Sequence, residues 1–300
     1  MASGPTGAGP ARPREEPVRA RALERTLRGM VPSVARLTYN PAVKAVLATA
    51  DVLPRLWFKE FRDFPPNHLR VRVGVRNRLF ANQVVYLRRG IAFWFWAFSE
   101  QLCGLDSDIV EIGCGCGRRP HHLRDFKFHD RRYTGRYLGI DVDREMLDWC
   151  RSNFDAPRFE FVQSTHASVA YRNEGASAPF RIPRADESVD FVFGTSVLTH
   201  VLEPGLVNYL DEAARILRPG RFLAISCFCT DYPPATYGGR HTFPHRMGEA
   251  WVESRKVPEA AVAYSEQFLV DQARRSGFSE AELRRNPGGG QHMLVARREP

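Results

Sequence analysis

Two kinds of segment alternate along the last two thirds of the chain. Short apolar runs, typical of buried strands, occur at residues 108–112, 137–140, 159–162, 188–193 and 222–228. Segments with apolar residues at helical spacing occur at residues 145–153, 206–217 and 268–276. The final stretch GQHMLVARR predicts an antiparallel edge strand. Strands that alternate with helices predict an α/β fold with a doubly wound, mostly parallel sheet, which binds ligands at the carboxyl ends of its strands.

The first hundred residues lack this regular order. Residues 1–38 are rich in Gly, Pro, Ala and Arg and offer little to bury, so we expect a disordered basic arm. Residues 39–56 predict a helix. The alternation of apolar and basic residues in 69–75 predicts an edge strand or an extended lid. Residues 86–102 predict an amphipathic helix, in which Phe93, Trp94, Phe95 and Trp96 pack in the core or, as the alternative, form a binding platform.

A second irregular stretch, rich in Pro, Gly and His, runs from Thr230 to about Val262. A loop of this length inside a compact domain is usually functional. We therefore expect an N-terminal cap or lid over residues 39–100 and a ligand-binding domain over residues 101–300, with a substrate-loop insertion at about 230–262.

The stretch DIVEIGCGCGR carries the main chemical signal. A strand is followed by Gly113, Gly115 and Gly117, and glycines in such a turn let backbone N–H groups approach a ligand. A second strand ends on Asp141, about where a ribose-binding carboxylate lies in a nucleotide-binding unit. Glu111, just before the glycines, suits a positively charged ligand and would repel a pyrophosphate. The spacing E-x-G-x-G-x-G also differs from the dinucleotide fingerprint GxGxxG, which disfavours an NAD(P)-dependent oxidoreductase.

This turn closely resembles motif I of the class I S-adenosylmethionine-dependent methyltransferases, and GIDVD resembles the acidic segment that follows it. The pieces PPNHLRVRVG, GCGCGR, LGIDVD, TSVLTH and FPHR-then-AVAYSEQFL resemble a bacterial group of type-11-like and type-25-like methyltransferases, over roughly residues 65–300. The resemblance implies a seven-stranded, mostly parallel sheet and S-adenosyl-L-methionine as the cofactor. Members of this group often act on glycans or other small molecules.

The resemblance also implies roles for individual residues. Glu111 and the three glycines would hold the methionine end of S-adenosylmethionine. Asp141 would accept hydrogen bonds from the ribose hydroxyls, and Val142 and Met146 would lie against the adenine.

Two later segments complete the expected cofactor site. Thr195 and Ser196, after the fourth strand, would line the donor pocket, or they would cap the helix that follows. Many methyltransferases carry an acid after the third strand, but this chain has Gln163-Ser164-Thr165-His166. A hydroxyl or a backbone carbonyl would therefore have to contact the adenine.

Histidines are the candidate catalytic groups, because a base that removes a hydroxyl proton works best near neutral pH. His200 follows the fourth strand, beside the expected position of the methyl group. Its alternative role is that of a structural histidine at a helix start. His241 and His245, in the long insertion, are candidates for the acceptor site, or they face water.

The charge of the chain is local. The net charge is +9, of which residues 1–38 supply +4 and Lys59 to Arg89 supply +6. The second stretch suggests an anionic acceptor, such as a sugar or a nucleotide-linked or lipid-linked glycan, unless it is a solvated face of alternating charge. No nucleic-acid-binding motif is present, so nucleic acid is not an expected partner.

The cysteines and apolar runs bear on location. The six cysteines include no CxxC pair, which favours buried reduced thiols over a metal site. The longest apolar run, 91–98, is too short to span a membrane, and the N-terminus lacks the apolar core of a signal peptide. We expect a cytoplasmic protein.

The sequence thus favours an S-adenosylmethionine-dependent methyltransferase (EC 2.1.1) that methylates a small molecule or glycan precursor, most simply at a hydroxyl oxygen. The alternatives are a non-catalytic or regulatory protein that binds S-adenosylmethionine, and a methyltransferase that acts on protein or RNA. The acceptor and the oligomeric state stay open.

Overall fold

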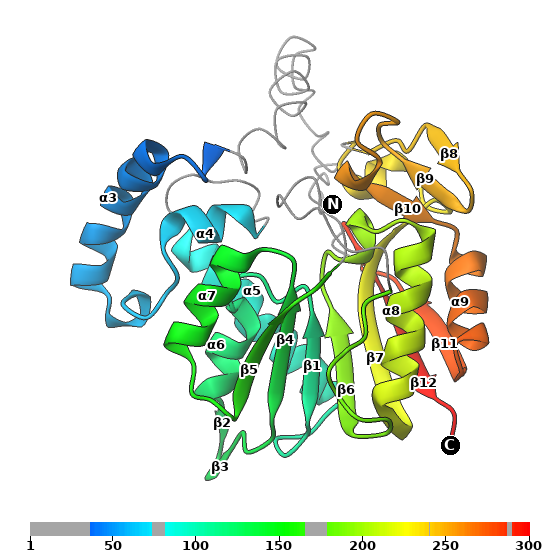
Figure 1. Ribbon diagram of the computed structural model, residues 1–300, viewed down its shortest axis with the longest axis horizontal. Helices are drawn as coiled ribbons and strands as arrows, with labels where there is room; N and C mark the ends of the chain where they lie inside the picture. Colours follow the sequence, from blue (N-terminus) through cyan, green and yellow to red (C-terminus); the bar gives the residue numbers. More distant parts are fainter. Residues whose placement is uncertain (1–36, 74–81, 166–178, 240, 287–289) are drawn as a thin grey trace, which may run out of the picture.

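A ten-stranded sheet forms the centre of the molecule, with helices on both faces (Figure 1). This computed structural model describes residues 37–73, 82–165, 179–239, 241–286 and 290–300. The main strands are β1 (Ile109–Ile112), β4 (Tyr137–Asp141), β5 (Phe159–Gln163), β6 (Val189–Gly194), β7 (Leu217–Cys229), β11 (Phe278–Arg284) and β12 (His292–Arg298). The helices are α3 (Pro41–Trp57), α4 (Asn67–Arg72), α5 (Gln83–Ser99), α6 (Arg118–Arg124), α7 (Arg144–Asn153), α8 (Glu203–Ile216) and α9 (Glu266–Arg275).

The seven main strands follow the order β5-β4-β1-β6-β7-β12-β11. Neighbours from β5 to β7 are parallel, whereas β12 runs antiparallel to both β7 and β11. The predicted doubly wound, mostly parallel seven-stranded sheet is therefore confirmed. The prediction of an edge position for the last strand was wrong, because β12 lies between β7 and β11.

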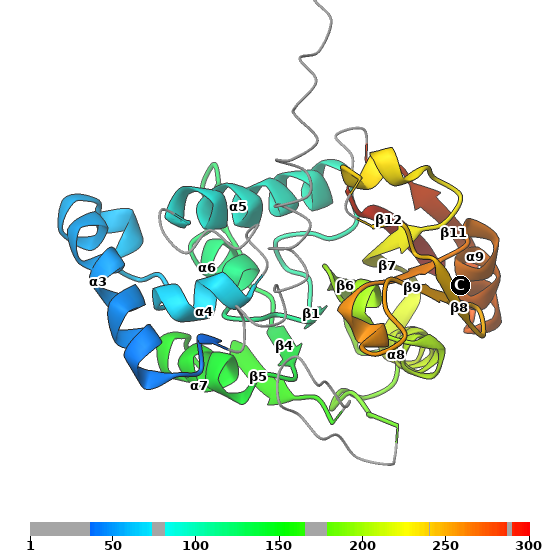
Figure 2. The same cartoon turned by 90° about the horizontal axis from the view of Figure 1, so that it is seen from above.

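The alternation of side chains along the strands divides the core into two layers. Ile109 and Phe191 point towards α5, α6 and α7, whereas Val110 and Val192 point towards α8 and α9. Figure 2 shows the two groups of helices on opposite sides of the sheet. Of the six aromatic residues in α5, Tyr86, Phe93 and Trp94 are buried as expected, but Phe95 is mostly exposed.

The N-terminal cap consists of α3, the 3₁₀ turn Lys59–Phe61 and α4. The predicted helix over 39–56 is confirmed by α3. The predicted edge strand or extended lid over 69–75 was wrong for its described part, because residues 67–72 form α4. The expected arm over residues 1–38 lies outside the described residues up to residue 36, but Thr38 is buried and bonded to Arg72.

The insertion expected as a loop at 230–262 includes short strands. It contains β8 (His245–Met247), β9 (Ala250–Val252) and β10 (Val262–Tyr264), with the 3₁₀ turns Pro234–Tyr237 and Pro258–Ala260. The three strands extend the sheet beyond the carboxyl end of β7 in the order β10-β9-β8. In Figure 1 the insertion and the cap stand at the two ends of the carboxyl edge of the sheet.

A small hairpin lies at the opposite, amino edge. It consists of β2 (Lys127–Phe128) and β3 (Arg131–Arg132), and it follows α6 in the basic connector between β1 and β4.

Candidate functional site

The glycine turn lies at the carboxyl end of β1, in the middle of the parallel sheet. Gly113, Gly115 and Gly117 all have positive φ angles, of 77°, 55° and 76°. Only glycine adopts these angles without strain, which explains the three alternate glycines of the sequence. The backbone N–H groups of Gly113 and Cys114 both donate to the carbonyl of Ile140, at 2.7 and 3.0 Å. These bonds fix the turn against the end of β4.

Asp141 ends β4 directly beside this turn. Its Oδ2 accepts a hydrogen bond from the Gly115 N–H at 2.7 Å, and its Oδ1 accepts one from the Asp143 N–H at 2.9 Å. Burial raises the pKa of Asp141 to about 6, although these two backbone donors oppose the rise. Each carboxylate oxygen keeps further acceptor capacity for a ligand hydroxyl. The structure therefore brings together the glycine turn and the carboxylate that the sequence paired.

Glu111 lies in β1, two residues before the first glycine of the turn. Its side chain is buried on the α6 side of the sheet, where Tyr137 donates a hydrogen bond to Oε2 and Arg119 Nη1 lies 3.8 Å from Oε1. Burial raises the pKa of Glu111 to about 7, against the attraction of Arg119. This placement favours a structural role for Glu111, through its contacts with Tyr137 and Arg119, over direct contact with a ligand.

The residues expected to contact the adenine lie around Asp141 and the start of α7. Val142 is partly exposed beside Asp141, and its carbonyl accepts a hydrogen bond from Gln163. Met146 is buried among Phe64, Leu69 and Tyr86 beneath the cap, and its Sδ lies 3.7 Å from the position of a Cβ on Gly115. The Ser164 hydroxyl, a candidate substitute for the missing acid, bonds the Tyr209 hydroxyl at 3.2 Å, and His166 lies outside the described residues.

Thr195 and Ser196 continue β6 at the same edge. Ser196 has a φ of 61°, which is strained for serine, and its N–H donates to the Ser226 hydroxyl at 2.7 Å. Thr195 Oγ1 is buried and has no hydrogen-bond partner within the described parts of the chain. Neither residue caps α8, whose N-cap is Leu202 without a side-chain bond, so the capping alternative was wrong. An unsatisfied buried hydroxyl at this edge indicates a position for a polar ligand atom.

His200 ends a 3₁₀ turn, Leu198–His200, and it is exposed. Its Nδ1 lies 2.9 Å from the carbonyl oxygen of Glu259 in the insertion. Because a carbonyl oxygen only accepts, Nδ1 carries the proton of the neutral ring and Nε2 keeps its lone pair. His200 thus has the tautomer that a general base needs, and Val197 of the same segment lies against Gly113.

The two insertion histidines are placed differently. His241 stacks on Phe243 with ring centroids 5.5 Å apart and also lies against Phe228. His245 lies on β8, the outermost strand of the insertion, three strands and so about 14 Å from β7. The structure therefore does not bring His245 to the glycine turn.

The cap reaches the glycine turn, which the sequence did not predict. Arg72 of α4 is buried and pairs with Asp143 at 3.0 Å and with Glu145 at 2.7 Å. Val73 then lies over the turn, so that a Cβ on Gly115 would be 2.5 Å from its Cγ1. The signal that could have revealed this contact is the pair of acids that flank the start of α7.

One cluster that could hold a cation was also missed. Cys229 Sγ and the carboxylates of Asp231 and Glu266 lie within 4.8 Å of one another where β7 ends and α9 begins. Burial raises the pKa of the Cys229 thiol to about 12, which keeps it protonated and makes it a weak metal ligand.

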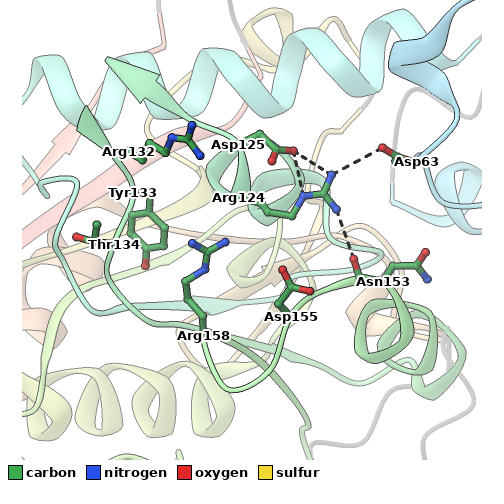
Figure 3. A pocket seen from close by; sticks show the side chains of 9 residues that line it. All are labelled: Asp63, Arg124, Asp125, Arg132, Tyr133, Thr134, Asn153, Asp155 and Arg158. Carbon is green, nitrogen blue, oxygen red and sulfur yellow. Dashed lines mark hydrogen bonds and ion pairs between the residues drawn. The ribbon is translucent and has the colours of Figure 1, made fainter. Parts of the chain in front are cut away.

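A hollow of about 670 Å³ lies at the amino edge of the sheet, away from the glycine turn (Figure 3). Its lining residues are Asp63, Arg124, Asp125, Arg132, Tyr133, Thr134, Asn153, Asp155 and Arg158. Three arginines face three aspartates, and Arg124 already pairs with Asp125 at 2.9 Å. Because parallel sheets bind ligands at their carboxyl edge, we assign no part of the chemistry to this hollow.

Residues 110–225 match a family model described as a methyltransferase domain. Over 115 residues the chain is 29% identical to the fatty-acid O-methyltransferase of Mycolicibacterium smegmatis, covering 38% of this chain and 34% of that protein. Over 167 residues it is 26% identical to the malonyl-[acyl-carrier protein] O-methyltransferase of Hahella chejuensis, covering 53% and 50%. The matched parts thus span between about a third and half of these curated relatives.

Solved structures also resemble the chain. One is the 1,6-didemethyltoxoflavin-N1-methyltransferase of Burkholderia thailandensis with bound 1,6-didemethyltoxoflavin and S-adenosylhomocysteine, at 15% identity and a TM-score of 0.44. The match covers 72% of this chain and 79% of that one. Among the described residues, no helix combines the length and the apolar character that crossing a bilayer requires.

Proposed function

We propose that this protein transfers a methyl group from S-adenosylmethionine to an oxygen atom of a small-molecule acceptor, because residues 110–225 match a methyltransferase-domain model. The observation that carries the proposal is the hydrogen bond from the Gly115 N–H to Asp141 Oδ2, which joins the glycine turn to the expected ribose ligand. His200, whose Nε2 keeps its lone pair, supplies a base at the same edge.

The residues at this edge fit the cofactor. Asp141 would bind the ribose hydroxyls, the turn at Gly113 and Gly115 would accommodate the methionine end, and Thr195 Oγ1 would donate a hydrogen bond to a polar atom of the ligand. When bound, S-adenosylmethionine supplies an electrophilic methyl group on a sulfonium. Glu111 holds the turn in place through Tyr137 and Arg119, without touching the ligand.

The chain's own contribution to the reaction is to position the acceptor and to remove its proton. His200 is held by the Glu259 carbonyl, so that Nε2 would be free to accept the proton of an acceptor hydroxyl. Glu259 belongs to the insertion, which therefore lies beside the base and forms part of the acceptor site.

An apolar, acyl-containing or hydroxylated lipid is the acceptor class that we favour. The curated relatives named above act on a fatty acid and on malonyl-[acyl-carrier protein], and the insertion packs Tyr237 and Phe243 against Phe228 of β7 in an apolar cluster. The anionic acceptor suggested by the basic stretch is less favoured. Two of its arginines, Arg70 and Arg72, are buried in ion pairs with acids of the protein itself.

Calorimetric titration with S-adenosylmethionine and S-adenosylhomocysteine tests the cofactor site, with Asp141→Ala as the variant that should lose binding. Methyl transfer from labelled cofactor to fatty acids, hydroxylated lipids and sugars then tests the acceptor. His200→Gln should lower kcat by about 10²- to 10⁴-fold with unchanged cofactor binding. His129→Gln, an exposed histidine at the amino edge, is the matched control. Binding without transfer to any acceptor would instead support a non-catalytic cofactor-binding protein.

A further inference from the structure

Helix α3 carries its charged residues on the side that faces the protein. Lys44 pairs with Glu145 at 2.5 Å, and Asp51 pairs with the buried Arg70 of α4. Arg55 donates to the carbonyl of Phe64 at 2.8 Å. The helix is therefore attached to the rest of the cap and to α7 by polar contacts, the reverse of an ordinary surface helix.

The outward side of α3 is apolar along its whole length. Its large exposed residues are Val46, Val52, Leu53, Leu56 and Trp57, with exposed fractions between 54% and 74%. The exposed residues between them are Ala42, Ala45, Ala48 and Thr49, so this side bears no charge. The apolar surface continues onto Phe58, which is 51% exposed. A contiguous exposed apolar face of this kind marks an interaction site.

We propose that this face, defined by Val46, Val52, Leu53, Leu56 and Trp57, docks on the surface of a lipid bilayer that contains anionic lipids. Figure 1 shows α3 at the outer end of the molecule, where a flat surface can approach it without meeting the sheet. Trp57 and Phe58 end the helix just before Lys59, and an aromatic residue next to a basic one is typical of the bilayer interface.

Charge complementarity favours an anionic surface. The 36 residues that precede the described part of the chain, and so lead directly into α3, contain seven arginines and three glutamates. Beyond the helix, Lys59 and Arg62 alternate with Glu60 and Asp63, so the positive excess comes from the preceding stretch. Each basic residue near an anionic bilayer adds to the attraction, which salt screens.

A second copy of the chain is a poorer partner for this face. A helix of 17 residues is about 25 Å long and about 10 Å wide, so one side offers a contact of roughly 250 Å². A standard protein interface buries about 800 Å² on each partner. A bilayer needs no such matched area, because it accepts whatever apolar side chains reach its interface.

The test is co-sedimentation of the full chain with phosphatidylcholine vesicles and with mixed phosphatidylcholine–phosphatidylglycerol vesicles. The chain should bind the mixed vesicles more tightly, and added salt should weaken binding. The double variant Leu53→Ser/Trp57→Ser should lower the partition coefficient about tenfold or more, since two large apolar side chains no longer enter the lipid. Phe128→Ser, which removes a 61% exposed apolar residue from β2, is the matched control and should bind as the wild type does.

Three results would overturn the proposal. The first is a negative vesicle assay, in which either the wild-type chain binds neither kind of vesicle or the double variant binds as well as the wild type. The second is light scattering that shows a dimer for the wild type and a monomer for the double variant, which would assign the face to a second copy. The third is Trp57 fluorescence, obtained by difference with Trp57→Phe, that is shielded from acrylamide without vesicles, which would assign the face to the chain's own residues. Cofactor binding and the unfolding temperature of each variant show whether it is folded, and neither depends on the proposed acceptor.

Discussion

Val73 of the cap lies directly on Gly115 of the glycine turn, so that a Cβ at position 115 would be 2.5 Å from Val73 Cγ1. Gly115 also has a φ of 55° and donates its N–H to Asp141. Three demands therefore meet at one residue: a left-handed backbone, contact with the cap and orientation of the carboxylate that we assign to the ribose.

Gly115→Ala should weaken binding of S-adenosylmethionine by tenfold or more, because the new methyl group displaces either Val73 or the turn. Gly238→Ala is the matched control, since Gly238 has a φ of 66° but nothing within 4 Å of an added Cβ. Both variants should lose roughly 1 kcal/mol of unfolding free energy from backbone strain. Calorimetry should show normal binding for Gly238→Ala alone, and equal binding by both variants would contradict the role of the contact.

Cofactor affinity should fall as the pH drops through about 6. Burial raises the pKa of Asp141 to about 6, and protonation removes acceptor capacity that the ribose hydroxyls need. Asp141→Asn should bind more weakly than the wild type at neutral pH and should lack this pH dependence. Titration calorimetry over a pH series measures both effects. A wild-type affinity that stays constant through pH 6 would argue against Asp141 as the ribose ligand.

Glu111 should make folding stability depend on pH in the opposite sense to an ordinary ion-paired acid. Its pKa is raised from 4.5 to about 7, so the folded protein binds this proton more tightly than the unfolded chain does. The stabilisation is present below pH 4.5 and is lost as the pH rises to about 7. In Glu111→Gln this component should be absent. Urea unfolding of both proteins across the interval measures the difference, and parallel pH profiles would refute it.

The sequence predicted the elements in which apolar residues are buried and polar residues are exposed. Strands β1, β4, β5 and β6 are short apolar runs, and the glycine turn with Asp141 was found because each residue type there has a backbone or charge requirement. The helix α4 was missed because Leu69-Arg70-Val71-Arg72 alternates like a strand. The arginines of this segment are buried and paired with acids distant in sequence. Their charge was therefore a misleading sign of an exposed position.

The acceptor side of the site was predicted less completely. The insertion was expected as a loop because β8, β9 and β10 have only three residues each and depend on pairing with the distant end of β7. The link from His200 to the Glu259 carbonyl joins residues 59 positions apart. No local pattern predicts such a contact.

The buried pair between Arg70 and Asp51 should be the strongest single polar contribution to the cap. Arg70 is held by both Asp51 oxygens and by Asn82, and its side chain is 1% exposed. Arg70→Met leaves Asp51 buried without its main countercharge and should lower the free energy of unfolding by about 3–5 kcal/mol. Arg246→Met is the matched control, because its pair with Glu249 is exposed and should contribute less than about 1 kcal/mol.

The double variant Asp51→Leu/Arg70→Met separates the charge from the packing. Removing both buried charges should recover part of the loss, because no unpaired carboxylate then remains in the interior. Urea unfolding of the wild type, Asp51→Leu, Arg70→Met and the double variant measures the coupling, and S-adenosylmethionine titration reports whether the cap still places Val73 on the glycine turn. If Arg70→Met lowered stability no more than Arg246→Met, the pair would not hold α3 and α4 together, and the cap would have to depend on its apolar contacts around Phe64 and Leu69.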